Sequence, residues 1–261
     1  MNLTNQSIWI TGASSGLGKQ LAIDVAKAGA TPVLFARNED RLNEVADTIR
    51  SIGGSVFIYK LDLSKTADIE AIVQDVFEKV GKIDILVNNA GFAVFDYADK
   101  ASIIDNEEMF AVNVLGLMAM TKAVIPRMKL QNRGHIINIA SQAGKLATPK
   151  SSVYAASKHA VLGYTNALRL ELAEASIFVT AINPGPIRTP FFERADEEGT
   201  YVKNIENIML TPEYVSKKII AIMKKPKREL NLPKWMGVAS KMYQLMPTLF
   251  EKIAGKKMRQ K

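Results

Sequence analysis

The chain has 261 residues, of which 48% are hydrophobic and 23% charged, so its composition excludes a disordered protein and supplies a large core. It has no cysteine, which excludes disulfide and thiol chemistry and fits a reducing cytoplasm. The net charge of +8 is uneven, because residues 201–261 hold 14 Lys and Arg against 4 Asp and Glu, whereas residues 1–200 carry a net charge of −2.

Strand and helix patterns alternate along most of the chain. Strands are expected at 7–11, 32–36, 56–59, 84–87, 134–139 and 177–182, with a short seventh at 230–232. Helices are expected at 16–28, 39–52, about 69–80, 106–129 and 151–173. This alternation predicts parallel βαβ units in an α/β fold: a single, doubly wound parallel sheet with helices on both faces. We expect one domain over residues 1–233, with a C-terminal amphipathic helical extension over 234–261.

The first strand runs into a glycine-rich turn, Thr11–Gly18, at the start of a helix. Such a turn lets the backbone approach a pyrophosphate, and the helix N-terminus supplies free N–H groups with a partial positive charge. The spacing is G-x-x-x-G-x-G, and its position at the first βα turn favours a Rossmann-type dinucleotide site over a ligand-free helix entry. The candidate cofactor-binding residues here are Gly12, Ser14, Ser15, Gly16, Leu17 and Gly18.

The end of the second strand indicates which dinucleotide binds. Enzymes that use NAD typically place Asp or Glu there to bind the ribose 2′-hydroxyl, but this chain has Ala36 followed by Arg37. A guanidinium can form two charge-assisted hydrogen bonds to a 2′-phosphate. The pattern predicts NADP(H), with Arg41 one turn further on as a possible second contact. The alternative is a solvated arginine at a helix start.

Tyr154 and Lys158 form an acid–base candidate. Four residues apart on a helix, they share one face. A free tyrosine titrates near ~10, and a neighbouring ammonium is expected to lower that pKa, so that the phenol can exchange a proton with an alcohol or carbonyl oxygen. Ser141 follows the fifth strand, at the sheet edge where doubly wound folds bind ligands. The alternatives are a buried structural tyrosine, a solvated lysine and a loop-capping serine.

Together these motifs resemble the short-chain dehydrogenase/reductase family over about residues 3–189. The matches are Thr11–Gly18, Asp62-Leu63, Asn88–Gly91, Asn113, Ser141, Tyr154-x-x-x-Lys158 and Pro184-Gly185, in that order. One departure is Ala140, where many relatives have a second serine.

The resemblance implies roles for individual residues. Ser141 would hold the substrate oxygen, Lys158 the nicotinamide ribose, and Asn113 a water in a proton relay, unless Asn113 is a structural helix-kink residue. Asp62 and Leu63 would meet the adenine, and Asn89, Ala90 and Gly91 would lie along the adenosine ribose and phosphates. Pro184, Gly185, Ile187 and Thr189 would hold the nicotinamide end. The resemblance also implies a homodimer or homotetramer that packs through the two long helices.

Other chemistry finds no support in the sequence. The two histidines, His135 and His159, share no ligand spacing, so we expect no metal site. No recognition motif for nucleic acid accompanies the basic C-terminal part. The N-terminal residues lack the basic and apolar segments of a signal peptide, so a cytoplasmic location is expected.

The resemblance implies that the last third of the chain shapes the substrate-binding site. Residues 186–212 form the predicted lid, and their aromatic and aliphatic side chains indicate an apolar substrate unless they pack on the body of the fold. In the extension, Val238, Met242, Leu245, Met246, Leu249, Phe250 and Ile253 fall on one side among lysines, with Pro247 as a kink. Such a helix suits an anionic membrane surface on the inner face, a neighbouring subunit or a roof over the substrate pocket.

The sequence thus predicts an NADP(H)-dependent oxidoreductase that interconverts a carbonyl and an alcohol by hydride transfer, with a Ser141–Tyr154–Lys158 site assisted by Asn113. The alternative is a catalytically silent NADP(H)-binding sensor or scaffold.

Overall fold

A computed structural model describes residues 2–146, 148–196 and 199–258, and of residues 254–258 only the backbone. Seven strands within these residues form one sheet in the order β3-β2-β1-β4-β5-β6-β7, and all neighbouring pairs are parallel. The α/β fold with a doubly wound parallel sheet is therefore confirmed. The strands are β1 (Ser7–Thr11), β2 (Thr31–Ala36), β3 (Phe57–Lys60), β4 (Ile85–Asn88), β5 (Gly134–Ile139), β6 (Ile177–Pro184) and β7 (Glu229–Leu232).

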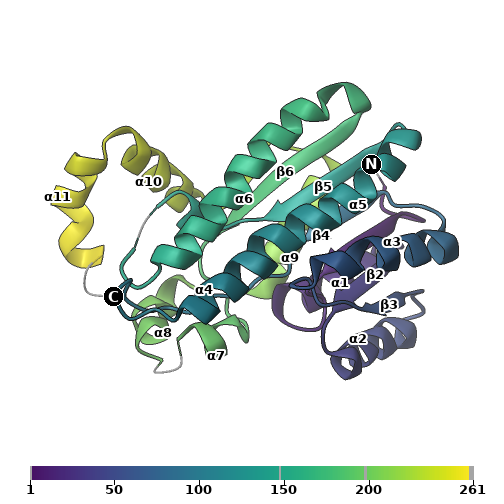
Figure 1. Cartoon of the computed structure of the whole chain (residues 1–261), viewed down its shortest axis with the longest axis horizontal. Helices are drawn as coiled ribbons and strands as arrows, with labels where there is room; N and C mark the ends of the chain where they lie inside the picture. Colours follow the sequence, from purple (N-terminus) through teal and green to yellow (C-terminus); the bar gives the residue numbers. More distant parts are fainter. Residues whose placement is uncertain (1, 147, 197–198, 259–261) are drawn as a thin grey trace.

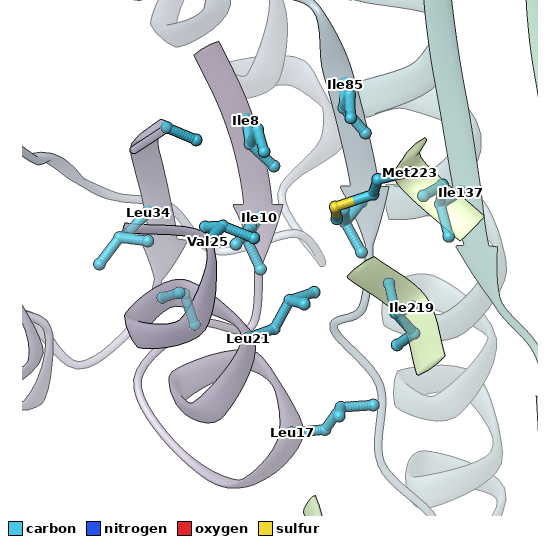
Figure 2. Close-up of a cluster of buried hydrophobic side chains, with 14 of the residues drawn as sticks. Ile8, Ile10, Leu17, Leu21, Val25, Leu34, Ile85, Ile137, Ile219 and Met223 are labelled. Atoms are coloured by element: carbon cyan, nitrogen blue, oxygen red, sulfur yellow. The ribbon is translucent and has the colours of Figure 1, made fainter. Parts of the chain in front are cut away.

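Helices cover both faces of the sheet, as the alternation of side chains along the strands requires. On β1, Ile8 and Ile10 join the core beneath α1 (Gly16–Lys27), α2 (Glu39–Ser51) and α9 (Pro212–Lys224). Trp9 points to the other face and packs with α3 (Thr66–Val80), α5 (Leu117–Leu130) and α6 (Ser152–Glu171). Figure 2 shows the first core, with side chains of α1 and α9 directed toward the strands.

The order of the strands creates the point at which a ligand can bind. The chain moves outward from β1 through β2 to β3, then returns to β4 on the other side of β1. Loops leaving the carboxyl ends of β1 and β4 therefore separate and open a crevice between them. The residues that follow β1, β2, β4, β5 and β6 all meet at this edge of the sheet.

The expected helix over 106–129 is interrupted. The structure has α4 (Ile103–Phe110), a π-helix η1 (Ala111–Gly116) and then α5. At Gly116 a Cβ would lie 2.5 Å from the carbonyl oxygen of Leu63, so the absence of a side chain lets the helix approach this loop. By length and composition the stretch Ile103–Leu130 could cross a membrane, but half of its most apolar window is buried, as in a core helix.

The lid and the extension stand at one end of the molecule. After β6 come the short helices α7 (Phe191–Ala195), α8 (Thr200–Ile205) and η4 (Glu206–Ile208). Beyond β7 follow α10 (Lys234–Leu245) and α11 (Pro247–Met258), so Pro247 opens a separate helix rather than kinking one. In Figure 1, α10 and α11 lie at the far left, opposite β3 and α2. Two 3₁₀ turns, η2 (Gln142–Gly144) and η3 (Ala173–Ala175), follow β5 and α6.

Candidate active site

A single cavity of about 820 Å³ runs along the carboxyl edge of the sheet, from the turn after β1 to α10. Nearly all residues singled out in the sequence line it: Gly12, Ser14, Ser15, Gly16, Leu17, Arg37, Asp62, Leu63, Asn89, Ala90, Gly91, Ser141, Tyr154, Lys158, Pro184, Gly185, Ile187 and Thr189. Gly18 and Asn113, also singled out in the sequence, do not line the cavity but contact the lining residues Gly12 and Phe92.

The glycine turn is built for close backbone approach. Gly12 and Gly16 have φ values of +65° and +53°, in the left-handed region that favours glycine. At Gly18 a Cβ would lie 2.2 Å from the carbonyl oxygen of Gly12, so this glycine lets α1 pack against the turn. The side chain of Asn89 fixes the turn from the β4 side by donating to the carbonyl oxygens of Thr11 at 2.9 Å and Gly12 at 3.2 Å.

The start of α1 fits an anionic ligand. Ser15 caps the helix but makes no side-chain capping hydrogen bond, and the first turn of α1 carries no acidic residue. The N–H groups of such an unblocked first turn face the cavity with the positive end of the helix dipole. Together with the left-handed glycines, this cradle fits the diphosphate of a dinucleotide.

Arg37 lies at the rim, where a 2′-phosphate would be read. Its Nη1 atom is 3.3 Å from Oε1 of Glu108 on α4, and 57% of its side chain is exposed. Arg41, one turn further on, also lines the cavity. Burial raises the pKa of nearby Asp62, but hydrogen bonds from Ser64 and the charge of Arg37 outweigh it and hold the pKa below its usual value.

Tyr154 and Ser141 meet at the opposite end of the cavity. Burial raises the pKa of Tyr154 to about 12, and a hydrogen bond with the Ser141 side chain opposes this rise. The Ser141 Oγ atom also accepts a 3.0 Å hydrogen bond from the Ala143 N–H, which fixes its position at the end of β5. The expectation that Lys158 lowers the pKa of Tyr154 is not met in this structure, because burial dominates and the lowering contribution comes from Ser141.

Lys158 lies beneath Tyr154 and is 4% exposed. Its Nζ atom donates a 2.9 Å hydrogen bond to the carbonyl oxygen of Ile139 and lies 5.8 Å from the centre of the Tyr154 ring. Burial lowers the pKa of Lys158 to about 8. A Cβ at Gly91 would lie 3.4 Å from this Nζ, so the glycine keeps space open beside the ammonium.

Asn113 occupies the π-helix and is fully buried. Its side chain accepts from the Phe92 N–H at 3.0 Å and donates to the Phe92 carbonyl oxygen at 2.9 Å and to Ser157 Oγ at 3.2 Å. Ser157 in turn donates to the carbonyl oxygen of Tyr154 at 2.8 Å. The amide side chain therefore ties the loop after β4 to the helix that carries Tyr154, and both of its N–H donors are used by protein groups.

Aromatic side chains surround the end of the cavity at which Tyr154 lies. The ring of Tyr154 makes edge contacts with Phe95 and Phe191, at centroid distances of 6.0 and 5.8 Å. Phe192 and Tyr201 of the lid stack at 5.9 Å within the same cluster. The two readings of the lid aromatics therefore both hold, since Phe192 is 9% exposed and packs against Phe95 of the body, while Phe191 and Phe192 both line the cavity.

The extension contributes part of the wall, in agreement with the roof over the pocket that the sequence offered as one of its three roles. Trp235, Met236 and Ala239 of α10 and Phe250 of α11 all line the cavity. Helical spacing grouped Phe250 on one side with Val238 and Met242, but Phe250 lines the cavity and packs edge-on against Tyr243 at 5.6 Å. The break at Met246 and Pro247 resets the helical phase, which a single continuous helix does not allow.

The chain resembles known proteins in sequence and in fold. The family model described as short chain dehydrogenase matches residues 6–199. A curated relative, dehydrogenase/reductase SDR family protein 7-like from Anopheles gambiae, is 42% identical over 193 residues, which are 72% of this chain and 61% of the relative. The chain thus spans about three fifths of that relative's length.

Solved structures agree in fold and carry two different cofactors. The closed form of serine dehydrogenase complexed with NADP+ is 34% identical, with a TM-score of 0.81, covering 87% of this chain and 94% of that one. A short-chain dehydrogenase/reductase from Burkholderia phymatum in complex with NAD is 25% identical, with a TM-score of 0.87, covering 95% and 96%. From the family match, these likenesses and the glycine turn, we conclude that the chain belongs to the short-chain dehydrogenase/reductase family.

Proposed function

We propose that this protein is an NADP(H)-dependent oxidoreductase that reduces an apolar ketone or aldehyde to an alcohol, and runs the reverse oxidation with the same residues. The observation that carries this proposal is the cavity itself. It joins the glycine turn, which fits a diphosphate, to the hydrogen-bonded Ser141–Tyr154 pair with Lys158 beneath it. When bound, the reduced cofactor supplies the hydride.

The proton chemistry follows from the state of Tyr154. With its pKa raised to about 12 by burial, the phenol is protonated at neutral pH and can donate its proton to a developing alkoxide. Ser141 holds the substrate oxygen beside it, and the hydrogen bond of Ser141 with Tyr154 opposes the rise in the pKa of that phenol. A protonated tyrosine is the state in which the residue can begin the reduction of a carbonyl.

The preference for NADP(H) rests on the rim residues. Arg37 and Arg41 both line the cavity where β2 ends, and the strand end itself carries Ala36 rather than an acid. Two guanidinium groups suit a 2′-phosphate, whereas the ribose of NAD(H) would lack its usual carboxylate partner. The similar solved structures contain either cofactor, so this preference belongs to the proposal.

The aromatic end of the cavity supports an apolar substrate. Phe95, Phe191 and Tyr201 face it from the lid side, and Trp235 and Met236 from α10. Such walls stabilise apolar ligands through buried area and give little orientation to charged ones. We expect affinity to rise with the length of the substrate's hydrocarbon part.

The test is NADPH consumption by the purified chain over ketones and aldehydes of graded chain length, with NADH in parallel. NADPH-preferring turnover that improves with chain length supports every part of the proposal. Cofactor binding without turnover on any compound would instead favour the silent sensor or scaffold, against which the intact Ser141, Tyr154 and Lys158 now argue.

A further inference from the structure

The helices α10 and α11 present two different faces. Met236, Ala239 and Phe250 line the cavity, and Gly237 and Ser240 are buried. The opposite face is apolar and exposed. Its residues are Val238, Met242, Leu245, Met246, Leu249 and Ile253, with exposed fractions between 46% and 82%. These residues are hereafter called the outer face.

Each of the two helices carries its part of the outer face along one side. Val238, Met242 and Leu245 follow one another at spacings of four and three on α10, so they lie on one side of that helix. Leu249 and Ile253 repeat the spacing on α11. A cluster of exposed apolar side chains on two successive helices is unfavourable in water and marks a place where another surface docks.

The charge of residues 234–261 indicates which kind of surface binds the outer face. Residues 234–261 contain seven Lys and Arg and one acidic residue, Glu251. Lys234, Lys241 and Lys252 are exposed and flank the outer face along the two helices. A second copy of this chain would bring the same positive charge to the contact, which disfavours pairing through this face. An anionic bilayer supplies both an apolar interior and opposite charge.

We propose that α10 and α11 form a docking surface for an anionic lipid bilayer. The outer face inserts at the boundary between headgroups and acyl chains, and the lysines contact the headgroup phosphates. Because the inward side of the same helices lines the cavity, docking places the aromatic end of that cavity next to the lipid. This last consequence rests on the proposed function, whereas the docking itself does not.

The chain carries its own probe. It has two tryptophans. Trp9 on β1 is fully buried in the core, whereas Trp235 at the start of α10 is 56% exposed. Transfer of Trp235 to the bilayer boundary should shift the emission to shorter wavelength, whereas Trp9 contributes a constant background. The variant Trp235→Phe removes the shift and so assigns it.

The experiment mixes the full chain with vesicles of phosphatidylcholine alone or of equal parts phosphatidylcholine and phosphatidylglycerol. We expect flotation with the anionic vesicles and an accompanying blue shift, both weakened by added salt. Leu245→Glu should lower the partition coefficient by about tenfold or more, since it removes a leucine that would insert into the bilayer and repels the headgroups. The matched control is Leu130→Glu, because Leu130 is 80% exposed against 82% for Leu245 but lies at the end of α5.

Three results would overturn the proposal: no binding to anionic vesicles, equal loss of binding in both leucine variants, or conversion of an oligomer to a smaller species by Leu245→Glu without lipid. The last result would assign the outer face to a second copy. Vesicle binding is measured without turnover, so its failure and the failure of the proposed reaction are separate outcomes. NADPH binding by each variant checks that the fold is intact.

Discussion

The Nη1 atom of Arg37 lies 3.3 Å from Oε1 of Glu108, so the residue proposed to read the 2′-phosphate is shared with an acid on α4. Glu108 also accepts a 2.6 Å hydrogen bond from Arg194 of the lid helix α7. This bond lowers the pKa of Glu108 against the effect of burial, and Arg37 lowers it further. One carboxylate thus links the cofactor rim to the lid.

Removing the charge of Glu108 should free the Arg37 guanidinium from this ion pair. We expect Glu108→Gln to tighten NADPH binding about twofold to fivefold, the range of a partly exposed ion pair. Fluorescence titration with NADPH at low salt measures it, with Glu107→Gln as the neighbouring exposed control. Weaker NADPH binding in Glu108→Gln would show that Glu108 orients Arg37 rather than competing for it.

Removing the guanidinium tests the cofactor assignment directly. Arg37→Ser should weaken NADPH binding by roughly 10-fold to 100-fold, because charge-assisted hydrogen bonds to the phosphate are lost. NADH lacks that phosphate, so its affinity should stay near the wild-type value. Arg50→Ser, which removes an exposed arginine on α2, serves as the control. Equal losses for both cofactors would contradict the role of Arg37.

Removing the phenol hydroxyl tests the proton donor. Tyr154→Phe should lower kcat by roughly 10²-fold to 10⁴-fold, the usual contribution of a positioned general acid. Cofactor affinity should remain close to wild type, because the ring and Lys158 stay in place. Tyr164→Phe on the same helix is the matched control, since Tyr164 does not line the cavity. Substantial turnover in Tyr154→Phe would remove Tyr154 from the reaction.

Lys158 should impose a cost on stability. Burial lowers its pKa to about 8. Between pH 8 and the unfolded value of 10.5, the unfolded state keeps a proton that the folded state has lost, so stability rises with pH across this window. Lys158→Met should therefore stabilise the fold at pH 7 by about 1–3 kcal/mol and abolish turnover.

Urea unfolding at pH 7 and at pH 10 measures this effect. The stabilising effect of Lys158→Met should shrink at the higher pH, where the wild-type ammonium is already neutral. Lys122→Met, at an exposed position on α5, should change neither value appreciably. A Lys158→Met protein that is less stable than wild type at pH 7 would mean that the hydrogen bond to Ile139 outweighs the cost of burying the charge.

His135 should set part of the acid limit. It is 4% exposed, and its Nε2 atom lies 2.8 Å from Oγ1 of Thr180. Thr180 donates its own proton to the Lys227 carbonyl oxygen, so Nε2 of His135 is the donor in the contact with Thr180. Burial lowers the pKa of His135 to about 4. As pH falls from 6.5 toward 4, the unfolded state takes up a proton that the folded state excludes, and stability is lost.

His135→Leu should therefore lose about 2 kcal/mol less stability than wild type between pH 7 and pH 5. Urea unfolding at the two pH values gives this difference. His159→Leu, an exposed position on α6, is the control and should follow the wild-type slope. If His135→Leu follows that slope as well, His135 is not the group that titrates.

The sequence was a good guide where the signal is local. Each strand was expected within a few residues of its observed place, because buried parallel strands are short apolar runs between helices. The glycine turn and the Tyr154–Lys158 spacing are likewise local. The π-helix around Asn113 agrees with the helix-kink alternative for that residue, but its hydrogen bond with Phe92, 21 residues away, could not be read from local spacing.

Long-range relationships were not available from spacing. The Arg37–Glu108 pair joins residues 71 positions apart, on β2's end and α4. The raised pKa of Tyr154 comes mainly from burial, which depends on residues distant in the chain rather than on the lysine one turn away. The inward turn of Phe250 depends on the break before Pro247, since a helical wheel assumes one uninterrupted helix.

Backbone hydrogen bonds join the two ends of the lid to each other. Ile187 and Leu210 form a parallel bridge, the Arg188 N–H donates to the Leu210 carbonyl oxygen at 2.9 Å, and the Leu210 N–H donates to that of Pro186 at 2.8 Å. The chain between Ile187 and Leu210 therefore begins and ends at the same place, and its bridge is separate from the pairing of β6 with β7. Such a segment can be lengthened, shortened or exchanged at little entropic cost. Evolution can then alter what the protein accepts while the dinucleotide cradle is inherited unchanged, and a transplanted lid should carry its selectivity with it.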